Sequence, residues 1–206
     1  MSGHLIICIG RQFGSGGREI GKKLSEKLGI AFYDKEILRK AAQEHGILPA
    51  AFEQADEKPR SLLYALSTAS YGSLVTPTNY DAPLTNDQLF RYQSATIKKL
   101  AEEGPCVLIG RCADAILQGE EGMFSLFIHA PLQARIERIC RVREVSEDVA
   151  RDLIKKTDRS RANYYNYYAE RDWGAVDSYD FSLNSAILGV DGSVDAIADL
   201  AGRFTK

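Results

Sequence analysis

A glycine-rich stretch at residues 10–18, Gly-Arg-Gln-Phe-Gly-Ser-Gly-Gly-Arg, contains the residue types that bind phosphate. The apolar run 5–9 precedes it, and apolar residues at helical spacing (Ile20, Leu24 and Leu28) follow it. This order predicts a strand, a tight turn and a helix, in which glycines let the backbone approach a ligand closely. The free N–H groups at the helix start and the helix dipole favour an anion, most often a phosphate. The alternative is a glycine-rich β–α turn that binds nothing.

The stretch departs from the GxxxxGK[ST] phosphate-loop motif at its end. Gly17 stands where the motif has lysine, and Arg18 and Glu19 follow where a hydroxyl is expected. Arg11, Arg18 or Lys22 could supply the missing positive charge, and the sequence does not choose among them. The nearby oxygens that could bind a magnesium ion belong to Ser15, Glu19 and Asp34.

The composition is that of an ordinary globular protein, with 206 residues, 45% hydrophobic and 26% charged. This length predicts one domain over residues 1–206. A net charge of -2 argues against a nucleic-acid partner. No apolar run reaches the roughly 18 residues of a membrane span, and no signal peptide is visible. The four cysteines form no CxxC pair, so we expect reduced thiols and a cytoplasmic location.

Polar residues follow two of the predicted strands. Asp34 ends the strand 30–34, and Arg111 follows the continuous apolar run 106–110. Further strands are predicted at 123–129 and 179–184. Because open α/β sheets bind ligands at the carboxyl ends of their strands, Asp34 and Arg111 are expected beside the glycine-rich loop. Asp34 could also act as the N-cap of a helix over residues 35–45.

The remaining chain is predicted to be helical, with one long polar exception. Residues 49–58, 87–103 and 194–204 have helical patterns, and Asn86 is the expected N-cap of the second. Residues 59–86 are rich in Ser, Thr, Tyr, Asn and Pro, with weak periodicity. We interpret them as an inserted arm, since surface loops of this length are usually functional or disordered.

Two arginine-rich helices are predicted after residue 130. The first carries arginines at positions 135, 138 and 141, with Arg143 just beyond it, and the second, starting at Ser146, contains Asp158-Arg159-Ser160-Arg161. Guanidinium groups bind phosphate oxygens bidentately, so two such helices could form a phosphate clamp. A solvated helix face is the alternative for any one arginine of the first helix. The tyrosines at 164–168 are interpreted as packing residues, with base stacking as the alternative.

Three motifs in this order resemble those of the nucleoside monophosphate kinases, most closely the divergent bacterial branch of the cytidylate kinase-like family. They are the loop within residues 7–38, the turn Gly110-Arg111-Cys112, and the run Asp-Arg-Ser-Arg-Ala-Asn-Tyr-Tyr at 158–165. The resemblance covers nearly the whole chain. It implies a three-layer α/β sandwich of the P-loop kinase type with a parallel five-stranded sheet. It also implies a helical lid around residues 143–161 and an inserted acceptor-binding arm at 59–86.

The resemblance implies ATP-dependent phosphoryl transfer to a nucleoside monophosphate similar to CMP or dCMP, with Mg2+ and with no nucleic-acid or membrane partner. Arg18, Arg159 and Arg161 would be catalytic. Asp34, Arg111 and Asp158 would lie on the acceptor side. The donor would be bound by Arg11, Gly14, Ser15, Gly16, Gly17, Arg18 and Glu19. Two residues depart from the family pattern: Gly17 replaces its lysine, and Cys112 replaces the Asp expected after Arg111. A non-catalytic nucleotide- or anion-binding regulator, or a P-loop kinase for another small molecule, is therefore an alternative.

Overall fold

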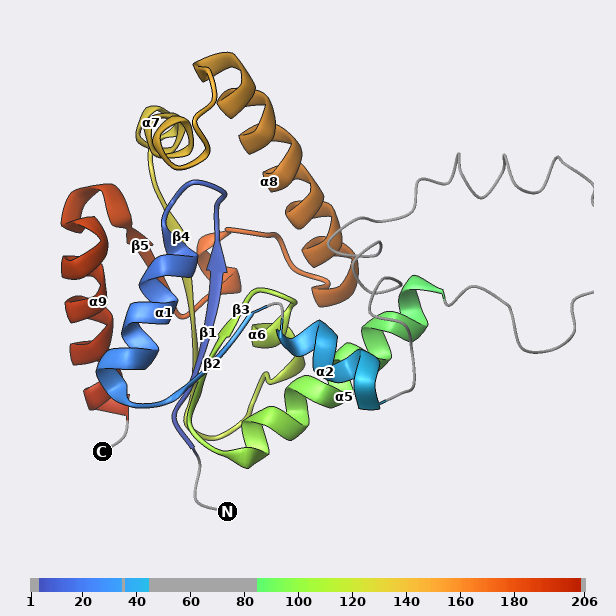
Figure 1. Cartoon of the computed structure of the whole chain (residues 1–206). Helices are drawn as coiled ribbons and strands as arrows, with labels where there is room; N and C mark the ends of the chain where they lie inside the picture. The colour runs from blue at the N-terminus through green and yellow to red at the C-terminus, as the bar shows by residue number, and fades with distance from the viewer. Residues whose placement is uncertain (1–3, 35, 45–84, 205–206) are drawn as a thin grey trace, which may run out of the picture.

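The computed structural model describes residues 4–34, 36–44 and 85–204 (Figure 1). The helix predicted at 49–58 and nearly all of the predicted arm at 59–86 lie outside these ranges. Within them, five parallel strands form one sheet in the order β2-β3-β1-β4-β5. The strands are β1 (Ile6–Arg11), β2 (Ala31–Tyr33), β3 (Cys106–Ile109), β4 (Met123–His129) and β5 (Phe181–Asn184). The expected α/β architecture with a parallel five-stranded sheet is confirmed.

One face of the sheet is covered by α1 (Gly17–Leu28) and α9 (Ser185–Phe204) (Figure 1). Ile20 and Leu24 of α1 are fully buried against the strands. Gly21 permits this close approach, because a Cβ there would lie 2.5 Å from Cδ1 of Ile109. Gly29 ends α1 in the left-handed conformation, as expected for a glycine after the last helical residue.

The other face is covered by α2 (Glu36–Glu44), α5 (Asn86–Glu103) and the short α6 (Ala113–Ile116). α5 begins one residue earlier than predicted, because its N-cap is Thr85 rather than Asn86. The Thr85 side chain accepts a hydrogen bond from the Gln88 N–H, and the Gln88 side chain accepts one from the Thr85 N–H. This reciprocal capping box satisfies two donors, which explains the one-residue difference.

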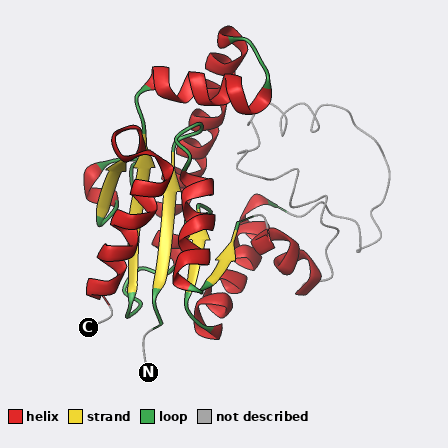
Figure 2. Cartoon of the chain, turned by 60° about the vertical axis from the view of Figure 1, so that its left-hand side comes forward, coloured by secondary structure: helices red, strands yellow, loops and turns green. Residues whose placement is uncertain are grey.

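A helical hairpin of α7 (Leu132–Arg143) and α8 (Glu147–Ala169) lies beyond the carboxyl ends of the strands (Figure 2). Ser146 caps α8, as predicted. The hairpin has its own apolar core of Ile136, Ile139, Ala150 and Ile154. Its far end packs on the main body, where the Tyr168 ring stacks on Phe90 at 4.0 Å between centroids. This supports the interpretation of the tyrosines as packing residues.

The final helix is longer than the predicted 194–204. It starts at Ser185 and is interrupted at Gly189, where φ is 67° and ψ is -175°. The Ser193 hydroxyl donates to the Gly189 carbonyl at 2.5 Å and holds the chain across this kink. In the described ranges, no helix has the combined length and apolarity that a membrane crossing requires.

Candidate nucleotide-binding site

The glycine-rich loop joins β1 to α1, as predicted, and is held by hydrogen bonds from several directions. Gly14 and Gly16 have φ of 85° and 81°, which an L-residue with a side chain adopts at a cost. The Ser15 hydroxyl donates to the Gln12 carbonyl at 2.9 Å. The buried Ser185 at the start of α9 donates through Oγ to the Ser15 carbonyl at 2.6 Å. The loop conformation is therefore set by its own turn and by a distant helix.

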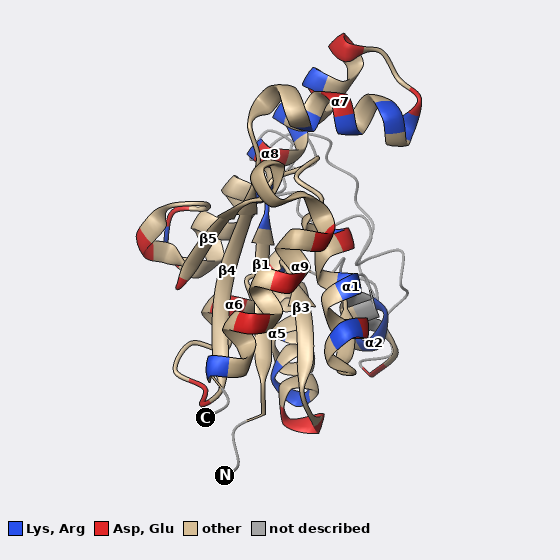
Figure 3. Cartoon of the chain, turned by 90° about the vertical axis from the view of Figure 1, so that its left-hand side faces the viewer, with Lys and Arg blue, Asp and Glu red and all other residues tan. Residues whose placement is uncertain are grey.

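A cavity of about 770 Å³ opens between this loop and the α7–α8 hairpin. The acidic residues that line this cavity are Glu19 and Asp34. Figure 3 shows that several Lys and Arg positions lie along α7. The cationic lining residues are Arg11, Arg18, Lys22, Arg111, Arg138, Arg143 and Arg161. Seven cations against two anions make the cavity suited to a polyanion such as a nucleotide polyphosphate.

Arg18 and Asp34 form an ion pair at the end of β2. Arg18 Nε donates to Asp34 Oδ2 at 2.6 Å, and the aspartate side chain is only 5% exposed while the arginine side chain is 62% exposed. The buried carboxylate thus fixes one side of a guanidinium whose remaining donors face the cavity and solvent. The structure brings Asp34 beside the loop, as expected from its position at the carboxyl end of a strand. The alternative role of Asp34 as a helix cap stays a prediction.

The two arginines of the Asp-Arg-Ser-Arg motif occupy different environments. Arg161 lines the cavity, and its Nη1 donates to the Arg11 carbonyl at 3.2 Å. Its guanidinium also lies 5.8 Å from the centre of the Phe13 ring, which Arg143 approaches to 5.2 Å. Arg159 is exposed and does not line the cavity. Its predicted catalytic role stays a prediction, and it would require the hairpin to move.

Asp158 connects the hairpin to the loop. Its Oδ1 accepts the Phe13 N–H at 2.7 Å, and its Oδ2 accepts Arg135 Nη1 at 2.5 Å. Arg135 Nη1 also donates to the Phe13 carbonyl at 3.3 Å. Both peptide groups around Phe13 are therefore held by one ion pair between α7 and α8. In this arrangement Asp158 positions the loop, and its predicted contact with the acceptor stays a prediction.

The turn after β3 has an unusual backbone. Gly110, Arg111 and Cys112 follow one another with φ of 66°, 62° and 56°. A Cβ on Gly110 would lie 1.9 Å from Arg11 Nη1, so this glycine leaves room for the Arg11 side chain. Left-handed conformations at non-glycine residues cost free energy and are found mainly where function or packing demands them. The turn directs Arg111 toward the cavity, where the sequence predicted it.

The buried Asp114, two residues beyond Cys112, was not identified from the sequence. Its Oδ2 accepts the Tyr165 hydroxyl at 2.6 Å. Burial raises the pKa of the Asp114 carboxyl, and the hydrogen bond from Tyr165 opposes that rise. Asp114 also lines a small cavity of about 20 Å³ shared with Arg111 and Arg161, enough for a single water molecule.

The residues that the structure describes do not form a set of direct ligands for a magnesium ion. No group of three His, Cys, Asp or Glu side chains in these ranges is arranged to hold a metal ion. Of the candidate oxygens, the Ser15 hydroxyl donates to a carbonyl, Asp34 contacts Arg18, and Glu19 contacts Arg138. These residues do not fit Mg2+ as direct ligands, although the ion can enter with nucleotide phosphates and waters as its ligands.

Sequence comparison identifies the family behind this geometry. The family model described as the cytidylate kinase-like family matches residues 6–187. The chain belongs to the cytidylate kinase-like family. It is thus a phosphotransferase of the nucleotide-kinase class, as the order of the three motifs predicted.

Relatives of the chain match most of its length. A cytidylate kinase from Natronomonas pharaonis is 25% identical over 198 residues, covering 96% of this chain and 88% of the relative. A cytidylate kinase from Methanobrevibacter smithii is 28% identical over 182 residues, covering 88% of this chain and 89% of the relative. These members and the present chain therefore share the whole domain rather than an isolated motif.

Solved structures show the same fold. An uncharacterized protein from Eubacterium ventriosum has a TM-score of 0.72 and 28% identity, with 96% of this chain and 98% of that chain covered. A shikimate kinase from Bacteroides thetaiotaomicron has a TM-score of 0.55 and 13% identity, with 96% of this chain and 98% of that chain covered. The second likeness shows that the fold is that of the P-loop kinases and says nothing of the acceptor.

Proposed function

We propose that this member of the family transfers the γ-phosphoryl group of ATP to a pyrimidine nucleoside monophosphate, CMP or dCMP. The observation that carries the proposal is the single cavity lined by the loop, Asp34, Arg111 and Arg161. The loop supplies backbone donors for the donor phosphates, while Asp34 and Arg111 lie at the ends of β2 and β3, where the acceptor would bind. The cytidylate kinases among its relatives support the choice of acceptor.

The chemistry requires alignment and charge neutralisation rather than a covalent enzyme intermediate. An oxygen of the acceptor phosphate forms a bond to the γ-phosphorus while the bond from that phosphorus to its bridging oxygen breaks. ADP then leaves with the bonding electron pair. Arg161 and Arg18 would stabilise the charge spread over the migrating group, because guanidinium donors fit its oxygens. Closure of the α7–α8 hairpin over the cavity would exclude water and prevent simple hydrolysis of ATP.

The decisive experiment is an acceptor screen with magnesium and ATP. CMP, dCMP, UMP, AMP and non-nucleotide acceptors are each incubated with the protein, and both ADP and the phosphorylated acceptor are quantified. We expect CMP or dCMP to be converted fastest, with little ADP formed when no acceptor is present. Transfer only to another acceptor would identify a different small-molecule kinase. ATP binding without transfer to any acceptor would identify the non-catalytic regulator, which the glycine at position 17 favours.

Arg161→Ala should lower kcat by about a hundredfold, the scale of removing one transition-state donor. The reason is that Arg161 lines the cavity from the hairpin side and its guanidinium is already anchored at the Arg11 carbonyl. Steady-state kinetics with the best acceptor measure the effect. Arg151→Ala, which removes an exposed arginine of the same helix, is the matched control and should keep kcat. Full activity of Arg161→Ala would remove this residue from the mechanism.

A further inference from the structure

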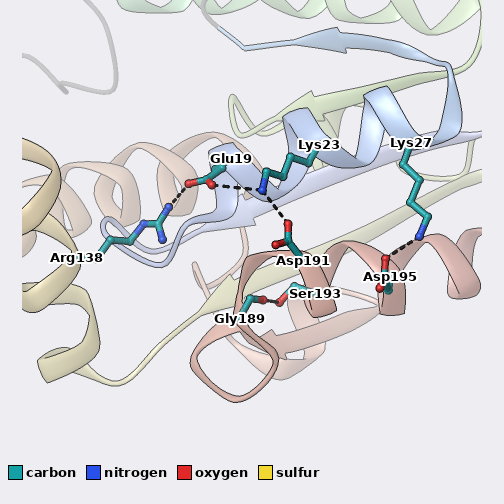
Figure 4. A network of polar contacts seen from close by, with 8 residues as sticks. All are labelled: Glu19, Lys23, Lys27, Arg138, Gly189, Asp191, Ser193 and Asp195. Atoms are coloured by element: carbon teal, nitrogen blue, oxygen red, sulfur yellow. Dashed lines mark hydrogen bonds and ion pairs between the residues drawn. The ribbon is translucent and has the colours of Figure 1, made fainter.

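Arg138 and Glu19 meet across the opening of the glycine-rich loop. Arg138 Nη2 on α7 donates to Glu19 Oε2 in the first turn of α1, although 119 positions separate the two residues (Figure 4). Both side chains line the cavity. The second carboxylate oxygen of Glu19 lies 3.9 Å from Lys23 Nζ. This pair therefore lies where the loop, the hairpin and the cavity meet.

The guanidinium of Arg138 also lies against the loop backbone. A Cβ built on Gly16 would be 3.3 Å from Arg138 Cζ, and the next residue, Gly17, has no side chain of its own. The family pattern has a lysine at position 17, so the positive charge of that lysine is missing from this position. Arg138 brings a cation to the same part of the loop from a different helix. Neither the loop motif nor the Asp-Arg-Ser-Arg motif includes it.

We propose that Arg138 binds the donor phosphates, and that Glu19 competes with those phosphates for its guanidinium. This inference rests on the proposed use of ATP as donor. A carboxylate and a phosphate are recognised by the same planar donors of arginine, so one can replace the other. The pair is half exposed, with Arg138 22% and Glu19 48% exposed, so its own contribution is small and a polyphosphate outcompetes it.

Glu19 has alternative partners once it leaves Arg138. Lys23 lies one helical turn further along α1, and the N-terminus of α1 stabilises a negative charge in its first turn. The exchange therefore leaves no charge without a partner. Its consequence is that Glu19 weakens ATP binding, whereas an ion pair that only fixes α7 against α1 would strengthen it.

Calorimetric titration with ATP, and separately with inorganic tripolyphosphate, tests this competition in the absence of an acceptor. Glu19→Gln should bind both ligands about two- to fivefold more tightly, because it removes the competing charge while keeping the side-chain size. Glu137→Gln removes an exposed carboxylate from α7 outside the cavity and should bind like the unaltered protein. Equal or weaker binding by Glu19→Gln would overturn the proposal, as would failure of the unaltered protein to bind either ligand.

The second arm tests Arg138 itself. Arg138→Ala should weaken ATP binding by about ten- to a hundredfold, the scale of a hydrogen bond to a charged group. Arg141→Ala, an exposed arginine of the same helix, should have no such effect. In the Arg138→Ala background, Glu19→Gln should no longer tighten binding, and a gain that persists there would contradict direct competition. These are binding measurements, so the absence of transfer to CMP would refute the proposed function and leave this result standing.

Discussion

Asp158→Ala should lower the free energy of unfolding by about 3–5 kcal/mol, the usual cost of leaving one member of a buried ion pair without its partner. Arg135 is the residue left behind, with a side chain 9% exposed, and Asp158 is 17% exposed. The substitution also removes the acceptor of the Phe13 N–H. Urea unfolding measures the loss as a lower midpoint with an unchanged slope.

Two further variants make this prediction specific. Asp152→Ala removes an exposed carboxylate from the same helix and should change the midpoint little. In a double-mutant cycle, the variant that combines Asp158→Ala with Arg135→Met should lose less free energy of unfolding than the two single variants lose together. The reason is that no buried charge then lacks a partner. Additive losses would show that the pair is not coupled.

A rise in the acceptor KM of Asp158→Asn, in a protein that remains folded, would support the predicted acceptor contact.

Gly16→Val should abolish measurable ATP binding. Gly16 has φ of 81°, a region that costs a residue with a side chain about 1–2 kcal/mol and that a β-branched residue resists most. Its Cβ would also project toward the Arg138 guanidinium, into the space between the loop and α7 that a phosphate needs. Titration with ATP measures the loss.

The matched control for Gly16→Val lies at the other end of α1. Gly29 has φ of 65°, but a Cβ there would have no atom within 4 Å. Gly29→Val therefore has a comparable backbone penalty without filling the cavity, and it should lose stability while keeping ATP affinity. If both variants bind ATP normally, the loop is not the donor site, and both the kinase and the nucleotide-regulator hypotheses fail.

The sheet was predictable because its strands are short apolar runs that end at chemically distinct residues. The strand at 123–129 has the predicted bounds, and β3 ends one residue earlier than predicted because Gly110 already turns with φ of 66°. The first half of α9 was missed for a tertiary reason. Glycines at 189 and 192 weaken the helical pattern of this segment, whereas in the structure Val190 packs against the apolar core of the sheet.

Those parts of the site that a single local motif forms could be predicted from the sequence. Contacts between segments that are distant in the sequence could not. The loop, Asp34 and Arg111 lie together because parallel strands place their carboxyl ends at one edge. Arg159 and Arg161 could have been separated in advance, since residues two apart on a helix point in nearly opposite directions. The contact of Arg138 with Glu19 could not be predicted, because nothing local relates residues 119 positions apart.

The cationic residues of the cavity affect the rate at which the protein binds nucleotides in solution. The whole chain has a net charge of -2, whereas the cavity has seven cationic and two anionic lining residues. The protein is thus electrically asymmetric, with an attractive field focused on the opening of the cavity. Small nucleotides are steered to that opening. Added salt should slow nucleotide capture, because counterions screen this field beyond roughly 10 Å at 0.1 M ionic strength.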